Sequence, residues 1–108
     1  MVTEVILKLE SSLQTDFIDL LKSLGYFVYK HPPYPTGMPD IHAFKDGKHY
    51  WFEVKRSEAD FKKNFENKAL QKLRRKLLRK AGDVACVVWL AEHIHSALNG
   101  DKIPKSRR

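Results

Sequence analysis

The sequence predicts a mixed α/β domain in which helices flank a small, mixed β-sheet. Two stretches carry apolar residues at three- and four-residue steps, as amphipathic helices do. Between them lie short runs rich in aromatic and β-branched residues, two of which are joined through an Asp-Gly dipeptide typical of a hairpin. A continuously apolar run follows the second helical stretch and indicates a buried strand that pairs in parallel after a crossover helix. The expected core order is αβββαβ, followed by a short closing helix.

The first half of the chain contains one helix and three strands. The helix covers at least residues 12–24 and ends at Gly25, and its start is left open between Thr3 and Ser11. Residues 26–30 form a short strand, and the proline-rich segment after it cannot be helical. Residues 40–45 and 49–55 are then expected to form a hairpin around Asp46-Gly47-Lys48.

The second half begins with a helix from residue 57 or 58 to residue 81. We expect one apolar stripe of this helix to face the core, with its basic residues on the remaining faces; the stripe comprises Phe61, Phe65, Ala69, Leu70, Leu73, Leu77 and Ala81. Gly82 ends the helix, residues 84–90 form the buried strand, and residues 91–98 form the closing helix.

Length and composition restrict the class of protein. A chain of 108 residues suits one domain, which we place at residues 1–101, with a basic tail at 102–108. The single cysteine excludes an internal disulfide framework and any multi-cysteine metal site. No apolar run approaches the roughly 20 residues of a membrane span, and the N-terminus does not resemble a signal peptide. We therefore expect a soluble, intracellular protein, placed in the cytoplasm, with no membrane partner.

The charge of the chain indicates an acidic partner. The formal net charge is +7, and apart from Glu66 every charged residue from 62 to 80 is basic. We interpret this segment as a nucleic-acid contact, with phosphates bound by Lys72, Arg75, Lys76 and Arg79. The alternative is an ordinary solvated helix face, and for the tail this alternative is equally good.

Three charged side chains meet at the hairpin. Asp40 opens one strand and pairs opposite the end of the next, where Glu53 and Lys55 share a face because side chains alternate along a strand. Paired carboxylates suit Mg²⁺ or Mn²⁺, and such an ion activates water for phosphodiester hydrolysis. The alternative is a structural ladder of cross-strand ion pairs.

The same residues carry a family resemblance. Gly37-Met38-Pro39-Asp40, followed by Glu53-Val54-Lys55, resembles the signature of the PD-(D/E)xK nucleases, and the order of elements is similar to a stand-alone VRR-NUC domain. The resemblance implies a restriction-endonuclease-like core in which Asp40, Glu53 and the Val54 carbonyl hold the metal and Lys55 is catalytic.

Further residue roles follow from this resemblance alone. Glu10 on the first helix would reach the metal through water, with Glu4 as the alternative, and Gln71 would position Lys55 or a phosphate. Lys30 and Gly37 would lie next to DNA, although a glycine there is also ordinary turn chemistry. The stretch between Lys55 and Gln71 is longer than is usual in the family, which weakens the assignment of Gln71.

The expected activity is that of a metal-dependent DNA endonuclease. The resemblance implies a homodimer that acts on branched DNA, including Holliday junctions, and the small size of the chain suggests little sequence specificity. The alternatives are a non-catalytic nucleic-acid-binding module that uses the basic helix, or a module that binds an acidic protein.

Overall fold

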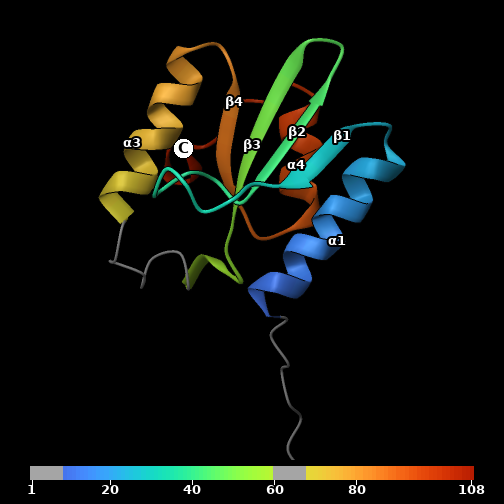
Figure 1. The fold of residues 1–108 in the computed structure, drawn as a ribbon, viewed down its shortest axis with the longest axis horizontal. Coiled ribbons are helices and arrows are strands. Elements are labelled where there is room, and N and C mark those ends of the chain that lie inside the picture. The colour runs from blue at the N-terminus through green and yellow to red at the C-terminus, as the bar shows by residue number, and fades with distance from the viewer. Residues whose placement is uncertain (1–8, 60–67) are drawn as a thin grey trace, which may run out of the picture.

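A four-stranded mixed sheet forms the centre of the structure, with helices beside and behind it (Figure 1). The computed structural model describes residues 9–59 and 68–108. The elements in chain order are α1 (Glu10–Ser23), β1 (Phe27–Lys30), β2 (Ile41–Lys45), β3 (Lys48–Val54), α3 (Lys68–Lys80), β4 (Val84–Val88), α4 (Ala91–Leu98) and the 3-10 turn η1 (Lys105–Arg107). The predicted α/β class, with a mixed sheet flanked by helices, is confirmed. The predictions for Thr3, Glu4, Phe61 and Phe65 fall outside the described residues.

The sheet has the order β1-β2-β3-β4, and the length of each connection decides whether neighbouring strands run antiparallel or parallel. β1, β2 and β3 are antiparallel neighbours, whereas β4 pairs in parallel with β3 after α3. Lys45 pairs with Lys48, so that only Asp46 and Gly47 form the hairpin turn, and both have positive φ angles of 53° and 79°. A two-residue turn of the I′ type requires this conformation, which asparagine, aspartate and glycine adopt most readily. The predicted hairpin is confirmed.

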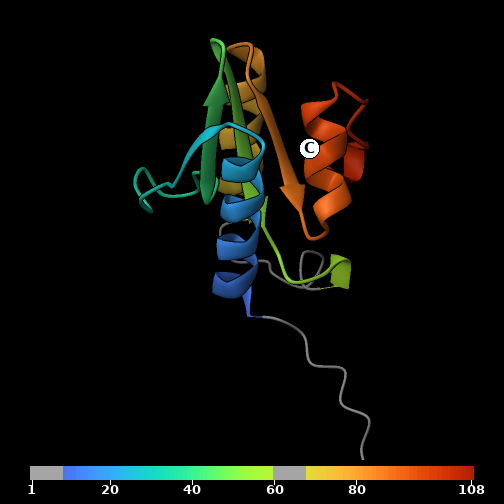
Figure 2. The ribbon, with the colours of Figure 1, turned by 90° about the vertical axis from the view of Figure 1, so that its right-hand side faces the viewer.

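The two faces of the sheet have different roles. One face packs against α1 and α4 and forms the hydrophobic core, in which Phe52 and Val54 of β3 meet Leu21 of α1 and Ile94 of α4. The other face carries Trp51, Glu53 and, beyond the strand, Lys55. Figure 2 shows α4 on one side of the sheet and the segment 31–40 protruding on the other. The side chains of Glu53 and Lys55 therefore project from the face opposite the main core.

Helix α3 turns a different face toward the sheet from the one that we expected. The side chains of Leu73 and Leu77 are each 48% exposed, whereas Arg75 is only 2% exposed. Arg75 Nη2 donates a hydrogen bond to the carbonyl oxygen of Arg108 (3.1 Å), and Arg79 Nη1 donates to that of Ala85 (3.2 Å). The prediction that Leu73 and Leu77 belong to an inward apolar stripe is therefore wrong. The spacing of apolar residues along a helix gives no information about backbone carbonyl groups that lie beside the helix in the folded protein.

The C-terminal basic segment packs against the rest of the fold. Its turn η1 contacts β4, and the side chain of Arg107 is buried. Arg108 Nε donates to the carbonyl oxygen of Ile103 (3.2 Å), while its own carbonyl accepts from Arg75. This segment thus supplies part of the surface on which α3 rests. Within residues 9–59 and 68–108, no helix is both long enough and apolar enough to cross a membrane.

Candidate active site

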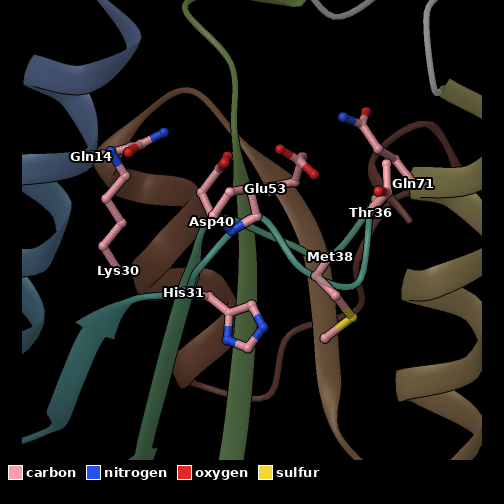
Figure 3. A pocket seen from close by; sticks show the side chains of 10 residues that line it. Gln14, Lys30, His31, Thr36, Met38, Asp40, Glu53 and Gln71 are labelled. Atoms are coloured by element: carbon pink, nitrogen blue, oxygen red, sulfur yellow. The ribbon is translucent and has the colours of Figure 1, made fainter.

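Two carboxyl groups meet where β2 begins and β3 ends. Ile41 pairs with Phe52, which places Asp40 opposite Glu53 on neighbouring strands. The backbone N–H of Val54 donates a 2.8 Å hydrogen bond to Oδ2 of Asp40, so this carboxylate is held against the end of β3. Figure 3 shows the side chains of Asp40 and Glu53 extending in the same direction from the sheet. The predicted pairing of these two residues across the hairpin is confirmed.

Glu53 is an acid in an environment that opposes its ionisation. Its side chain is 3% exposed, and its Oε1 is buried without a hydrogen-bond partner in the structure. Burial raises the pKa of Glu53 to about 9, and the hydrogen bond and negative charge of Asp40 act in the same direction. The positive charges of Lys55 and Arg75 oppose the shift only in part. Without a further cation, Glu53 is therefore protonated at neutral pH.

Lys55 lies beside this carboxyl pair. It follows β3 by one residue, and its backbone N–H still donates to the carbonyl oxygen of Val88 (3.1 Å), which holds this part of the chain against β4. Its side chain is buried, and its ammonium lies close enough to Glu53 to favour the ionised carboxylate. The structure thus brings Asp40, Glu53 and Lys55 together, as the sequence predicts.

The carboxyl pair opens into a cavity of about 420 Å³ between α1, the sheet, the segment 31–40 and α3. The cavity is lined by Glu53 and by four other residues that the sequence assigned to the site, which are Lys30, Gly37, Asp40 and Gln71. Lys30 comes from β1 and Gln71 from α3, so their placement depends on the packing of the whole domain. The cavity is large enough for several water molecules or a phosphate group.

Gly37 has a structural reason for being glycine. Its φ angle is 88°, and a Cβ atom at this position would lie 2.7 Å from Cγ of Leu70 and 3.3 Å from the backbone nitrogen of Gln71. Arg74 Nε also donates to the carbonyl oxygen of Thr36 (3.2 Å). The glycine therefore allows the proline-rich loop to approach α3 and sets the position of Gln71. Its predicted proximity to DNA stays a prediction.

Helix α1 presents Gln14 to the cavity. Gln14 is buried, lines the cavity and has an Oε1 without a hydrogen-bond partner in the structure. Glu10 lies one turn earlier and is not among the lining residues, so its contact with a metal through water stays a prediction. The alternative, Glu4, lies outside the described residues. Gln14 could have been found from the sequence, because it lies on the same helix face as Phe17 and Leu21, where a polar residue is unusual.

His31 is a second lining residue that the sequence analysis missed. It directly follows β1, and its backbone N–H donates to the carbonyl oxygen of Asp40 (2.7 Å). Nothing in the local sequence distinguishes it from other loop histidines, because its place depends on the pairing of β1 with β2.

The basic helix α3 divides its charges between solvent and interior. Lys72 and Lys76 are exposed and remain candidates for phosphate contact. Arg75 is buried, and burial lowers its pKa while the nearby Glu53 opposes that shift. Arg79 is half-buried, and its guanidinium binds the Ala85 carbonyl. The prediction that Arg75 contacts DNA from the helix surface is therefore wrong, since its side chain is enclosed and serves the packing of α3.

The donor set fits one hard divalent cation. The described residues contain no group of three or more His, Cys, Asp or Glu side chains in a metal-binding arrangement. Mg²⁺ and Mn²⁺ need only one or two carboxylates, because water and substrate oxygens complete the shell. The buried, unpartnered Oε1 of Glu53 beside Asp40 is an acceptor of this kind.

A scan of the chain against protein-family models finds no matching family, and a search of curated proteins finds no relative. The functional assignment therefore depends on the geometry of the site and on the motif in the sequence.

Proposed function

We propose that this protein is a divalent-metal-dependent DNA endonuclease with a restriction-endonuclease-like core of the VRR-NUC type. The observation that carries the proposal is the pair Asp40 and Glu53, which converge from two strands at a cavity. Lys55 does not line this cavity, but its charge acts on Glu53. A buried acid with a pKa of about 9 and an unpartnered oxygen is costly as a purely structural feature. Perturbed acids of this kind in a cavity are typical of functional sites.

In this proposal Asp40 and Glu53 hold Mg²⁺ or Mn²⁺, and the family resemblance adds the carbonyl oxygen of Val54 to them. A bound ion of this class lowers the pKa of a water molecule and stabilises negative charge on phosphate oxygens. The hydrogen bond from Val54 N–H orients Asp40 before any ligand arrives. Lys55 provides a fixed positive charge next to the carboxyl pair, where it stabilises the negative charge that develops during hydrolysis. Lys30 and Gln71 bind and orient the phosphate from opposite walls of the cavity.

DNA is the substrate that the charge favours. The chain carries a net charge of +7, and Lys72 and Lys76 are exposed on α3. A small domain of this kind binds mainly through phosphate contacts, which do not distinguish base sequences. Branched DNA, including four-way junctions, and a homodimeric assembly follow from the family resemblance and belong to the same proposal.

The test is a cleavage assay with matched variants. Purified protein is incubated with a labelled four-way junction or with a linear duplex, in Mg²⁺, in Mn²⁺ or in EDTA. We expect cleavage only with the metals, and loss of cleavage in Asp40→Asn and Glu53→Gln. Asp19→Asn is the control, because Asp19 is exposed on α1. Asp40→Asn should bind DNA as well as the wild type or better, since it removes negative charge that repels phosphate. Glu53→Gln should bind DNA as well as the wild type, because it replaces a protonated acid with an uncharged amide.

The outcomes separate the proposal from its alternative. Undiminished cleavage by either site variant, or cleavage in EDTA, would contradict the assignment of the carboxylates. Binding of DNA without any cleavage by the wild type would instead support a non-catalytic nucleic-acid-binding module.

A further inference from the structure

An aromatic surface lies on the same sheet face as the candidate site. We call it the aromatic platform, and it consists of Phe27 and Tyr29 of β1, His42 and Phe44 of β2, and His49 and Trp51 of β3. The strand register places Phe27 opposite Phe44, Tyr29 opposite His42, and His42 opposite Trp51. Side chains in register on adjacent strands project from the same face, so these rings form one continuous layer.

The outer part of the platform is open to solvent. The side chain of Phe27 is 62% exposed and that of Tyr29 is 37% exposed. Phe44 and His49 are half-buried, and the ring centroids of Phe27 and Phe44 are 4.8 Å apart with an interplanar angle of 32°. Exposed large aromatic side chains that gather in one place commonly mark an interaction surface.

The inner part of the platform is held rigidly. The rings of His42 and Trp51 stack with centroids 3.8 Å apart and planes inclined by 6°. His42 also contacts the Tyr29 hydroxyl through Nδ1 (2.9 Å) and His49 Nδ1 through Nε2 (2.8 Å). Trp51 Nε1 donates to Oδ2 of Asp83 (2.9 Å). His42 and Trp51 are themselves buried, so these contacts act by holding the exposed ring of Tyr29 in place. Fixing that ring in advance lowers the entropic cost of binding a flat ligand.

The platform leads directly to the cavity. The ring of Tyr29 lies 6.0 Å from that of His31, and His31 lines the cavity that contains Asp40 and Glu53. Lys30, between Tyr29 and His31 in the chain, lines the same cavity. A nucleic-acid strand with one phosphate in the cavity can therefore place the neighbouring bases against the platform.

We propose that the aromatic platform stacks the unpaired bases of a single-stranded stretch of nucleic acid next to the cleaved phosphodiester. Exposed aromatic rings on an open sheet bind two or three bases in this way in other proteins, and stacking tolerates any base because every base has a flat face. The net charge of +7 favours a polyanion as the occupant of this surface. The position of the nucleic-acid strand next to the cleaved bond rests on the proposed nuclease function, whereas stacking of bases on the platform does not.

The experiment measures binding in EDTA, which removes the metal ions that the proposed cleavage requires. The probes are a labelled oligothymidylate, the same sugar-phosphate strand without bases, and a duplex of equal length, compared by fluorescence anisotropy at one salt concentration. The test variant is Phe27→Ala, with Phe27→Tyr as the conservative variant. Leu73→Ala is the matched control, because Leu73 is an exposed apolar residue on α3.

We expect Phe27→Ala to bind oligothymidylate about 5- to 150-fold more weakly, which is the range for loss of one stacked base. Its affinity for the base-free strand and for the duplex should be unchanged. Phe27→Tyr should retain most of the affinity, and Leu73→Ala should match the wild type. Because Phe27 is largely exposed, Phe27→Ala should fold normally, and thermal unfolding followed by circular dichroism checks this.

Equal affinity of the wild type and Phe27→Ala for oligothymidylate would overturn the proposal. So would equal binding of the wild type to the strands with and without bases. Light scattering, which measures the molecular mass in solution, tests whether a second copy of the chain covers the platform. If Phe27→Ala converts a dimer to a monomer without a base-dependent loss of affinity, the stacking proposal is overturned. A base-dependent loss in a protein that cleaves no DNA would support the platform while refuting the nuclease, so the two proposals fail separately.

Discussion

Replacing Glu53 with glutamine should change how the stability of the metal-free protein depends on pH. Glu53 is buried beside Asp40, and its pKa in the folded state is about 9, compared with an ordinary value of 4.5. Between these two values the folded state retains a proton that the unfolded state has released. Stability is therefore greatest below the ordinary pKa and falls as the pH rises toward about 9. Glu53→Gln keeps the size of the side chain and removes this titration.

The magnitude follows from proton linkage. One proton bound only by the folded state changes the free energy of unfolding by about 1.4 kcal/mol for each pH unit. Between about pH 6 and about pH 8, the wild type should thus lose about 2 to 3 kcal/mol more than Glu53→Gln. Groups that do not interact with Glu53 titrate in both proteins and cancel in the comparison, including His42, whose pKa is lowered to about 4 by burial and by the charges of His49 and His31.

The assay is urea unfolding in EDTA, followed by circular dichroism at several pH values for both proteins. Parallel pH profiles for the wild type and Glu53→Gln would refute the raised pKa. Addition of Mn²⁺ at about pH 8 should restore stability to the wild type and have little effect on Glu53→Gln, because a bound cation compensates for the ionised carboxylate. Equal stabilisation of both proteins would refute a role for Glu53 in binding the ion.

Three further predictions concern the cationic residues. Lys55→Ala should lower the cleavage rate far more than the DNA affinity, because the charge of Lys55 acts mainly in the transition state. An equal fall in rate and affinity would show that Lys55 is an ordinary phosphate contact. Replacing Lys72 and Lys76 with glutamine should flatten the log–log salt dependence of duplex binding by about 1 to 2 units. The matched pair Lys22 and Lys48, which is exposed on α1 and at the hairpin, should leave the slope unchanged. An unchanged slope in the first double variant would remove α3 from the DNA interface. Arg75→Met should reduce the free energy of unfolding by about 1 to 3 kcal/mol in urea titrations, because the partly buried Arg108 carbonyl loses its donor. Normal stability together with weakened DNA binding would show instead that Arg75 contacts DNA at the surface.

The hairpin and its carboxyl pair could be predicted from the sequence because they depend on local rules. Asp46-Gly47 adopts the turn conformation on its own, and a two-residue turn determines the register of both strands. Alternation along the strands then places Asp40 opposite Glu53 and directs Lys55 to the same face. The same local patterns predicted the parallel strand β4, which ends at Val88 and not at residue 90. They also predicted the closing helix α4, whose observed bounds agree with the predicted range.

The orientation of α3 was decided by tertiary structure. Apolar spacing predicted that Leu73 and Leu77 face inward, but Arg75 and Arg79 do so instead, because carbonyl groups of Arg108 and Ala85 offer partly buried acceptors. A buried acceptor without a donor is costly, and the positions of these two carbonyl groups depend on how β4 and the C-terminal segment lie beside the helix. No pattern within the helix could indicate this competition.

The walls of the cavity and the open aromatic platform likewise depend on packing between distant segments. Gln14 rather than Glu10 lines the cavity because α1 docks at one particular rotation, and Gly37 is required by its approach to Leu70 of α3. The aromatic residues of the three strands are visible in the sequence, yet their exposure depends on which part of the sheet face the helices leave uncovered. The sequence by itself determined the chemistry that is available on each strand. The tertiary structure decided which of these groups are buried, paired or accessible, because burial is a property of several segments together.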